Sequence, residues 1–235
     1  MPPLTMRTDA GFTLGPIPIP RRRQIANNLF RFASIKAGMR PVCCESSLEA
    51  DGIYAKEGDP RVVWLCEQGL RIDRPIGKQP WYTFDLAYRT RDGDDMLEAF
   101  KPTSALVLAA DGTLKPPHWD AIEGACNELG RRCTFTTEVD LAPKKFLIHN
   151  WRVLLPFAFA TYEDPDNELL ANLTMLAGRG AGTTLLDLQG AEHLRDPEIV
   201  TGHVALLLHR GELTAPLDEA PFTQSTKLRT ASNGK

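Results

Sequence analysis

Three residues have side chains that suit the cleavage of a phosphodiester bond: Glu49, Asp85 and Lys101. A hard divalent cation such as Mg²⁺ takes oxygen ligands, commonly one or two carboxylates together with waters and phosphate oxygens. The cation stabilises the developing charge and lowers the pKa of the attacking water. A nearby ammonium helps to hold the water and offsets phosphate charge. We therefore treat all three as candidate catalytic residues and the two acids as candidate metal ligands.

Two of the three residues also have a simpler interpretation. Glu49 follows Ser46 by three residues, so it could be only the acidic member of a capping box. Lys101 could be a solvated strand end. Asp85 is harder to explain in this way, because a carboxylate between two large apolar residues would be costly if it were buried without a partner.

The elements that would position these residues follow an α/β order. The sequence predicts a helix from Ser46 to about Gly58 and strands over 62–65, 81–88 and 96–101, the last two forming a hairpin. A second helix is expected from Pro117 to a stop at Gly130, followed by a strand over 133–139. Because a strand–helix–strand crossover makes parallel neighbours, we expect a mixed sheet flanked by helices.

Alternation along the strand 81–88 predicts which face each side chain takes. One face would carry the large apolar side chains, namely Tyr82, Phe84, Leu86 and Tyr88. Asp85 would share the other face with Thr83 and Ala87. In the next strand Lys101 would share its face with Leu97 and Ala99, and the hairpin would bring Asp85 and Lys101 to the same side of the sheet.

The pattern changes beyond about Asn150 to short helices, expected over 166–176, 183–194 and 197–209, with a small hairpin from 211–213 and 223–228. Three helices and a hairpin are the outline of a winged helix-turn-helix. The predicted organisation is an extended or disordered arm (1–20), an α/β domain (21–148), a helical winged-helix-like domain (149–229) and a disordered tail (230–235).

Charge is divided unevenly along the chain. The net charge is −3, from 27 Lys and Arg against 30 Asp and Glu, which argues against a histone-like DNA-binding protein. Residues 151–235 hold 7 basic and 11 acidic residues, whereas residues 1–150 hold 20 and 19. For the acidic second half, electrostatics favour a protein partner over tight phosphate binding.

A basic stretch opens the first half and is the candidate DNA contact. Phosphate contacts are expected from five of its residues, Arg21, Arg22, Arg23, Lys36 and Arg40. The alternative is an amphipathic helix whose charged face is solvated. The chain has no membrane-length apolar run and no secretory signal at its start, and its five cysteines form no Cys-x-x-Cys pair, so we expect free thiols in the cytoplasm and no membrane association.

Several short motifs resemble those of TnsA-type endonucleases, the restriction-endonuclease-like subunits of heteromeric, Tn-seven-like transposases in the PD-(D/E)xK superfamily. Four segments carry the resemblance in order: residues 33–40 with 44–49, Cys66-Glu67-Gln68, Tyr82-Thr83-Phe84-Asp85, and Phe100 to Leu106. Phe84 stands where the family has proline. The resemblance covers about residues 21–140 by motif, and the helical half by architecture only.

The resemblance implies a restriction-endonuclease-like fold and a nuclease that uses Mg²⁺ or Mn²⁺ to cut DNA at the 5′ ends of a transposon. Glu49 and Asp85 would bind the metal, and Lys101 would face the scissile phosphate. The implied partners are double-stranded DNA at transposon ends, a DDE-type transposase subunit and an AAA+ regulator, in the nucleoid of a bacterial cytoplasm.

One position departs from the pattern of the wider superfamily, which has an acid two residues before the lysine. Here that residue is Ala99, whose side chain cannot bind a metal. A bulge could re-aim Glu98, the nuclease could be weakened, or the Phe100 carbonyl could complete the ligand set. We expect the last, because a main-chain carbonyl is a good ligand for a hard cation.

Two other functions stay open on the sequence. Ala99 favours a catalytically silent scaffold that binds the transposase, the regulator or DNA without cutting. The same fold could also serve a nuclease of DNA repair or junction resolution.

Overall fold

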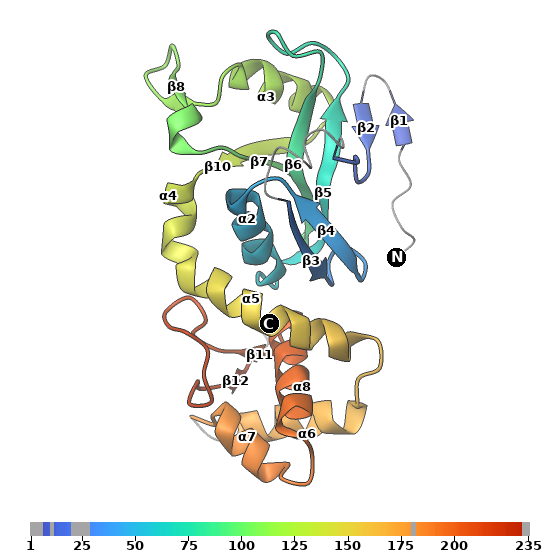
Figure 1. Cartoon of the computed structure of the whole chain (residues 1–235), viewed down its shortest axis with the longest axis vertical. Coiled ribbons are helices and arrows are strands. Elements are labelled where there is room, and N and C mark those ends of the chain that lie inside the picture. The colour runs from blue at the N-terminus through green and yellow to red at the C-terminus, as the bar shows by residue number, and fades with distance from the viewer. Residues whose placement is uncertain (1–6, 10–11, 20–28, 180–181, 232–235) are drawn as a thin grey trace. The chain divides into compact units, whose positions relative to one another are not determined.

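The fold was analysed in a computed structural model that describes residues 7–9, 12–19, 29–179 and 182–231. The chain forms two compact units (Figure 1). The first, called here the sheet unit, comprises Met1–Lys56 and Arg61–Ala142. The second, called the helical unit, comprises Glu57–Pro60 and Pro143–Lys235.

A mixed sheet is the framework of the sheet unit. Its strands, in spatial order, are β1 (Arg7–Asp9), β2 (Phe12–Leu14), β5 (Val62–Ile72), β6 (Tyr82–Thr90), β7 (Asp95–Phe100) and β10 (Arg132–Thr136). Only β7 and β10 pair in parallel; the other neighbours are antiparallel. The parallel pair is the one that the helical crossover predicts, so the expected mixed α/β sheet is confirmed.

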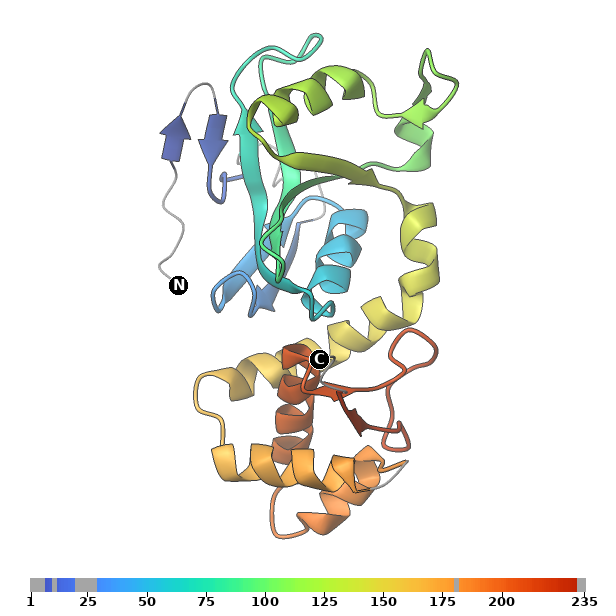
Figure 2. The same cartoon turned by 180° about the vertical axis from the view of Figure 1, so that it is seen from behind.

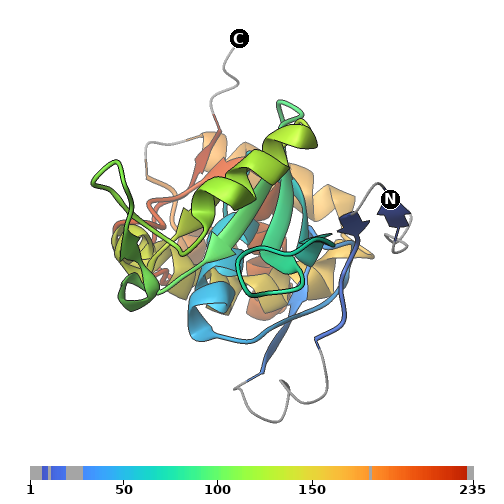
Figure 3. The same cartoon turned by 90° about the horizontal axis from the view of Figure 1, so that it is seen from above.

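Each face of the sheet has its own apolar core. Helix α3 (Trp119–Glu128) covers one face through Trp119, Ile122, Ala125 and Cys126 (Figure 3). Helix α2 (Ser47–Glu57) covers the other through Ala50 and Ile53, together with the hairpin of β3 (Phe30–Ser34) and β4 (Arg40–Cys44) (Figure 2). We call these the α3-side core and the α2-side core.

Strand β6 changes face at Asp85, so the predicted alternation is wrong. Tyr82 and Phe84 pack in the α3-side core, whereas Leu86 and Tyr88 pack in the α2-side core. The ladder with β5 is irregular at the same place. Glu67 pairs with Leu86 and Leu70 with Phe84, so two residues of β5 lie opposite Asp85 alone. This bulge lies in β5, where Gln68 has a φ of 48°. It changes the pairing with β6 at the point where the β6 side chains change face.

In its described residues, the helical unit has four helices and a short ladder. These are α5 (Lys145–Tyr162), α6 (Asn167–Gly178), α7 (Leu185–Ala191) and α8 (Pro197–Arg210), with β11 (Leu213–Thr214) pairing antiparallel to β12 (Arg229–Thr230). Side chains that accept backbone N–H groups begin the last three helices: Asp166, Thr184 and Asp196. The sequence predicts these three helices within a few residues, and it places the second strand of the ladder too early.

Three features of the structure bear on the predicted organisation. Helix α5 runs through the expected boundary between residues 148 and 149, and the compact units divide the chain after Ala142 instead. Within the predicted extended or disordered arm, β2 belongs to the sheet, with Phe12 in the α3-side core. The described part of the basic stretch forms the β3–β4 hairpin and no helix.

Smaller elements complete the sheet unit. They are the 3₁₀ turn η1 (Thr103–Ala105), the hairpin of β8 (Val107–Leu108) and β9 (Leu114–Lys115), and α4 (Glu138–Leu141). The 3₁₀ turn η2 (Ala142–Lys144) begins at the last residue of the sheet unit and continues into the helical unit. The predicted strand over 133–139 therefore ends early, because Thr137 caps α4. None of the described helices combines the length and the apolar character that crossing a membrane requires.

Two helical glycines give a test of how α2 is held against the sheet. A Cβ on Gly52 of α2 would lie 2.0 Å from the Phe100 ring, whereas a Cβ on Gly124 of α3 would meet nothing within 4 Å. We expect Gly52→Ala to lower the free energy of unfolding by about 1–3 kcal/mol through overpacking. Gly124→Ala, the matched control, should raise it by up to about 1 kcal/mol through helix propensity. Urea denaturation followed by circular dichroism measures both; equal effects would contradict this packing.

Candidate metal centre

Asp85 is the centre of the polar contacts between β6 and the end of β7. Its Oδ2 accepts the Phe100 N–H at 2.8 Å and a hydrogen bond from the Lys101 Nζ at 3.1 Å. The last registered pair of β6 and β7 is Leu86 with Glu98, so the carboxylate contacts β7 just beyond the regular ladder. The Asp85 side chain is only 12% exposed. This partial burial is supported by both a charge partner and a backbone donor, as a buried carboxylate requires.

Glu49 lies in the first turn of α2 and does cap the helix. Ser46 Oγ accepts the Glu49 N–H at 3.2 Å and donates to Glu49 Oε1 at 2.9 Å, and Glu45 N–H donates to Glu49 Oε2 at 3.0 Å. The capping alternative that the sequence left open is therefore present. The capping contacts do not exclude a second role for this carboxyl.

Burial, and next the negative charge of Asp85, raise the pKa of Glu49 to about 7. The hydrogen bonds from Glu45 and Ser46 act in the opposite direction and are outweighed. The Asp85 carboxylate is therefore near enough for its charge to act on the Glu49 carboxyl. The structure therefore brings Glu49 to Asp85, and Asp85 to Lys101, from α2, β6 and the end of β7.

The donor set suits a hard cation, although it is small. Two carboxylates supply oxygen ligands of the kind that Mg²⁺ and Mn²⁺ prefer. Among the residues that the structure describes, no group of three or more His, Cys, Asp or Glu side chains could hold a metal ion. A cation at Glu49 and Asp85 would thus need main-chain or solvent oxygens as well. Phe100 lies at the site through its N–H group, and the expected role of its carbonyl stays a prediction.

Ala99 and Glu98 lie on opposite faces of β7. Ala99 is fully buried in the α3-side core. Glu98 extends to the other face, where it pairs with Lys56 at 2.8 Å and accepts from Thr136 Oγ1 at 2.5 Å. Since Glu98 stays in register with Leu86, no bulge re-aims it toward Asp85. The acid next to Ala99 therefore serves an internal ion pair.

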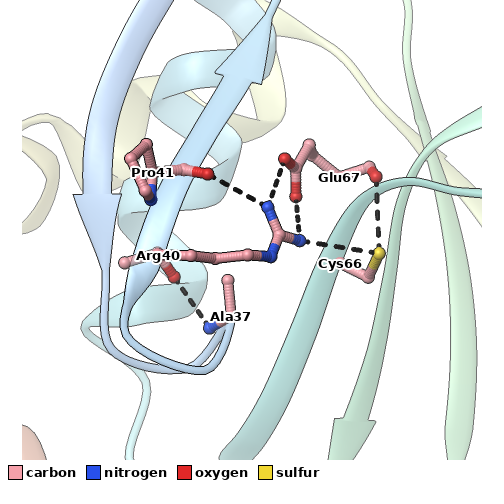
Figure 4. Close-up of polar contacts among 6 residues, drawn as sticks. Ala37, Arg40, Pro41, Cys66 and Glu67 are labelled. Carbon is pink, nitrogen blue, oxygen red and sulfur yellow. Dashed lines mark hydrogen bonds and ion pairs between the residues drawn. The ribbon is translucent and has the colours of Figure 1, made fainter. Parts of the chain in front are cut away.

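The candidate DNA contacts that the structure describes make contacts within the protein. Figure 4 shows the guanidinium of Arg40 held by Glu67 in two hydrogen bonds of 2.6 Å, with the Pro41 carbonyl and Cys66 Sγ on either side. Lys36 is buried, and its Nζ donates to the Lys56 carbonyl at 2.8 Å. Both residues fix the β3–β4 hairpin in place. Arg21, Arg22 and Arg23 lie outside the described residues.

Two polar clusters around the centre escaped the sequence reasoning. The first is the Arg40–Glu67 pair, and the second joins Lys56 to Glu98 and to the Tyr88 hydroxyl at 3.2 Å. A signal for the first existed in the Glu67-Gln68 step, which the sequence singled out without a role. A signal for the second was the acidic Glu98 inside an apolar strand. In neither case does local sequence identify the partner, which comes from another element.

Comparison of the chain with protein-family models and with curated proteins found no match. The interpretation of the site therefore depends on its geometry and on the motifs in the sequence.

The raised pKa of Glu49 predicts an unusual pH dependence of stability. Between its ordinary value of 4.5 and about 7, the unfolded chain has released a proton that the native protein still holds. Rising pH in this window therefore destabilises the metal-free protein. A cation that needs both carboxylates ionised should reverse the trend and, at about 100 times its Kd, stabilise by about 2–3 kcal/mol at about pH 8, with a smaller effect at about pH 5.5.

Thermal unfolding with and without Mn²⁺ at the two pH values measures this dependence. Glu49→Gln keeps much of the capping geometry and should remove both the pH trend and the Mn²⁺ effect. A Mn²⁺ stabilisation that is the same in Glu49→Gln as in the parent protein would exclude Glu49 as a ligand.

Proposed function

We propose that this protein is a metal-dependent DNA endonuclease, the TnsA-like subunit of a heteromeric transposase, which hydrolyses phosphodiester bonds at the 5′ ends of the transposon. The observation that carries the proposal is the convergence of Glu49, Asp85 and Lys101 from three separate elements. These are the residues that the motifs nominate, and they lie far apart in sequence. Two acids and a lysine beside the ends of two neighbouring strands are the side chains that the proposed chemistry requires.

Each residue has a distinct part in the proposed chemistry. Glu49 and Asp85 would hold Mg²⁺ or Mn²⁺, which supplies Lewis acidity and lowers the pKa of bound water. Lys101, 29% exposed, can turn its ammonium from Asp85 to a phosphate oxygen when DNA arrives. The Phe100 N–H keeps the Asp85 carboxylate in place during that exchange. In this proposal the side chains of the protein promote the reaction by positioning the metal and the phosphate and by supplying charge, more than by transferring protons.

The architecture supports the proposal at a coarser level. A mixed sheet with α2 beside the candidate centre and α3 on the opposite face is consistent with a restriction-endonuclease-like domain. In the helical unit, α6, α7 and α8 with the β11–β12 ladder are consistent with a winged-helix-like domain. The acidic excess of residues 151–235 favours docking to a protein, for which the transposase subunit and the AAA+ regulator are the proposed partners.

The second candidate is a catalytically silent scaffold of the same assembly. A specific observation favours it: Ala99 removes the third acid, and the Lys101 ammonium already neutralises Asp85. In this function the Asp85–Lys101 pair would only join β6 to β7, and the protein would bind its partners or DNA without cutting.

Nicking of supercoiled plasmid DNA in Mn²⁺ tests the first proposal. Asp85→Asn and Lys101→Ala should each reduce the rate at least about 100-fold, because each removes a charge aimed at the reacting phosphate. Asp92→Asn, in the exposed turn between β6 and β7, is the matched control and should cut at the parental rate.

The outcomes separate the candidates. Nicking by Asp85→Asn at the parental rate would overturn the nuclease assignment, provided that circular dichroism shows it folded. A parent protein that does not cut even with its transposase partner, and does not bind Mn²⁺, would be the scaffold. Faster cutting of branched DNA than of transposon-end duplex in the partner's presence would indicate a repair or junction-resolving nuclease.

A further inference from the structure

A separate cavity of about 360 Å³ lies between the β5–β6 connection and the start of α3. Its lining residues are Ile76, Lys78, Gln79, Tyr82, Pro117 and His118. None of them belongs to the candidate metal centre, and all lie within the sheet unit. The volume is in the range of small-ligand sites.

A tight turn forms one wall of the cavity and is fixed by its backbone. Ile76 N–H donates to the Gln79 carbonyl at 2.9 Å, and Gln79 N–H donates back to Ile76 at 3.1 Å. Gly77 and Lys78 are thus the two central residues of a hairpin turn, and Gly77 has a φ of 60° that suits glycine. The turn holds Lys78 at its tip, exposed to solvent.

His118 forms the facing wall in a conformation that few residues adopt. It precedes α3 with a φ of 62°, and its side chain makes no capping hydrogen bond. Its ring packs so closely on the turn that a Cβ at Gly77 would lie 2.2 Å from Nε2. A non-glycine residue in the left-handed region costs free energy that the surroundings must supply. The His118 backbone keeps this unfavourable conformation although its imidazole does not cap α3; the imidazole lies beside the cavity instead.

The walls combine cationic and flat apolar groups. Lys78 and His118 provide donors for an anion, and the Gln79 amide can both donate and accept. Among the described residues no carboxylate pairs with Lys78. Tyr82, Ile76 and Pro117 supply an apolar surface, and Trp81, next to Tyr82 in the chain, is 51% exposed. A ligand in which an anionic group is joined to a flat ring could contact both the polar groups and the apolar surface.

We infer that this cavity binds one nucleotide of a DNA strand, with its phosphate at Lys78 and His118 and its base or sugar against Tyr82 and Pro117. Phosphate contacts from lysine and base contacts with aromatic rings are the usual means of holding single strands. The choice of DNA as the source of the nucleotide rests on the proposed function. The same chemistry would admit a free mononucleotide, so the test distinguishes the two.

Fluorescence anisotropy of a labelled single-stranded oligodeoxynucleotide measures the contact in the full-length protein. Lys78→Ala and His118→Asn should each weaken binding about tenfold, and Lys78→Ala should reduce the salt slope of log K by about 0.7. Asparagine tolerates the left-handed backbone of His118, so the second variant keeps the turn into α3. Lys78→Arg should restore most of the affinity.

Arg132→Ala is the matched control, because it removes one exposed charge from the sheet unit outside the cavity. It should change affinity less than twofold. Equal loss in Arg132→Ala and Lys78→Ala would mean that only net charge matters, and unchanged affinity in both Lys78→Ala and His118→Asn would mean no contact. Either result overturns the site.

A titration with a deoxynucleoside monophosphate, followed by calorimetry, separates the two sources of nucleotide. Lys78-dependent binding of the monophosphate without Lys78-dependent binding of the oligonucleotide would overturn the DNA assignment. If the parent protein binds the oligonucleotide in a Lys78-dependent way but does not cut plasmid, the nuclease proposal fails while the nucleotide site stands.

Discussion

The contact of the Asp85 carboxylate with the end of β7 is the constraint on which the candidate centre depends. One oxygen accepts both the Phe100 N–H and a hydrogen bond from Lys101, just where the β6–β7 ladder stops. A carboxylate that is 12% exposed needs such partners, because its charge is costly away from water. The bulge in β5 allows this contact by turning β6 at Asp85, so that Phe84 and Leu86 enter different cores.

The elements around the centre are held by buried or half-buried charges that have partners within the sheet unit. Lys56 pairs with Glu98, and Arg40 with Glu67, so that α2 and the β3–β4 hairpin are each attached to a strand of the sheet. Such pairs contribute less net stability than their short distances suggest, because both charges lose hydration. Their geometry is nevertheless specific, since removing one partner leaves the other charge buried. These pairs hold α2 and the hairpin against the sheet that carries Asp85. Burial, and next the charge of Asp85, raise the pKa of Glu49, and a divalent cation bound there would offset that charge.

The contacts in the structure show which of the charged side chains along the chain have partners within the protein. The net charge of −3 describes neither part of the molecule. Much of the basic content of the described sheet unit is used internally, as Lys36, Arg40 and Lys56 demonstrate. Lys78, at the tip of the turn beside the cavity, has no carboxylate partner among the described residues. A count of Lys and Arg residues along the sequence therefore overstates how many of these side chains are available to contact DNA. The contacts in the structure leave only a few of them as candidates.

The sequence by itself determined the order of most elements, the parallel strand pair across α3, the later helices within a few residues, and the identity of Glu49, Asp85 and Lys101 as candidates. Local signals suffice for these, because periodicity, caps and crossovers act over a few residues. It did not determine α5, whose apolar pattern spans the expected domain boundary, or the strand β2 in the supposed arm. The tertiary structure alone decided that β6 turns at Asp85, that Arg40 and Lys36 face inward, and that Glu98 belongs to Lys56. The physical reason is the same in each case: a charge takes the partner that burial leaves within reach, and that partner comes from an element distant in the chain.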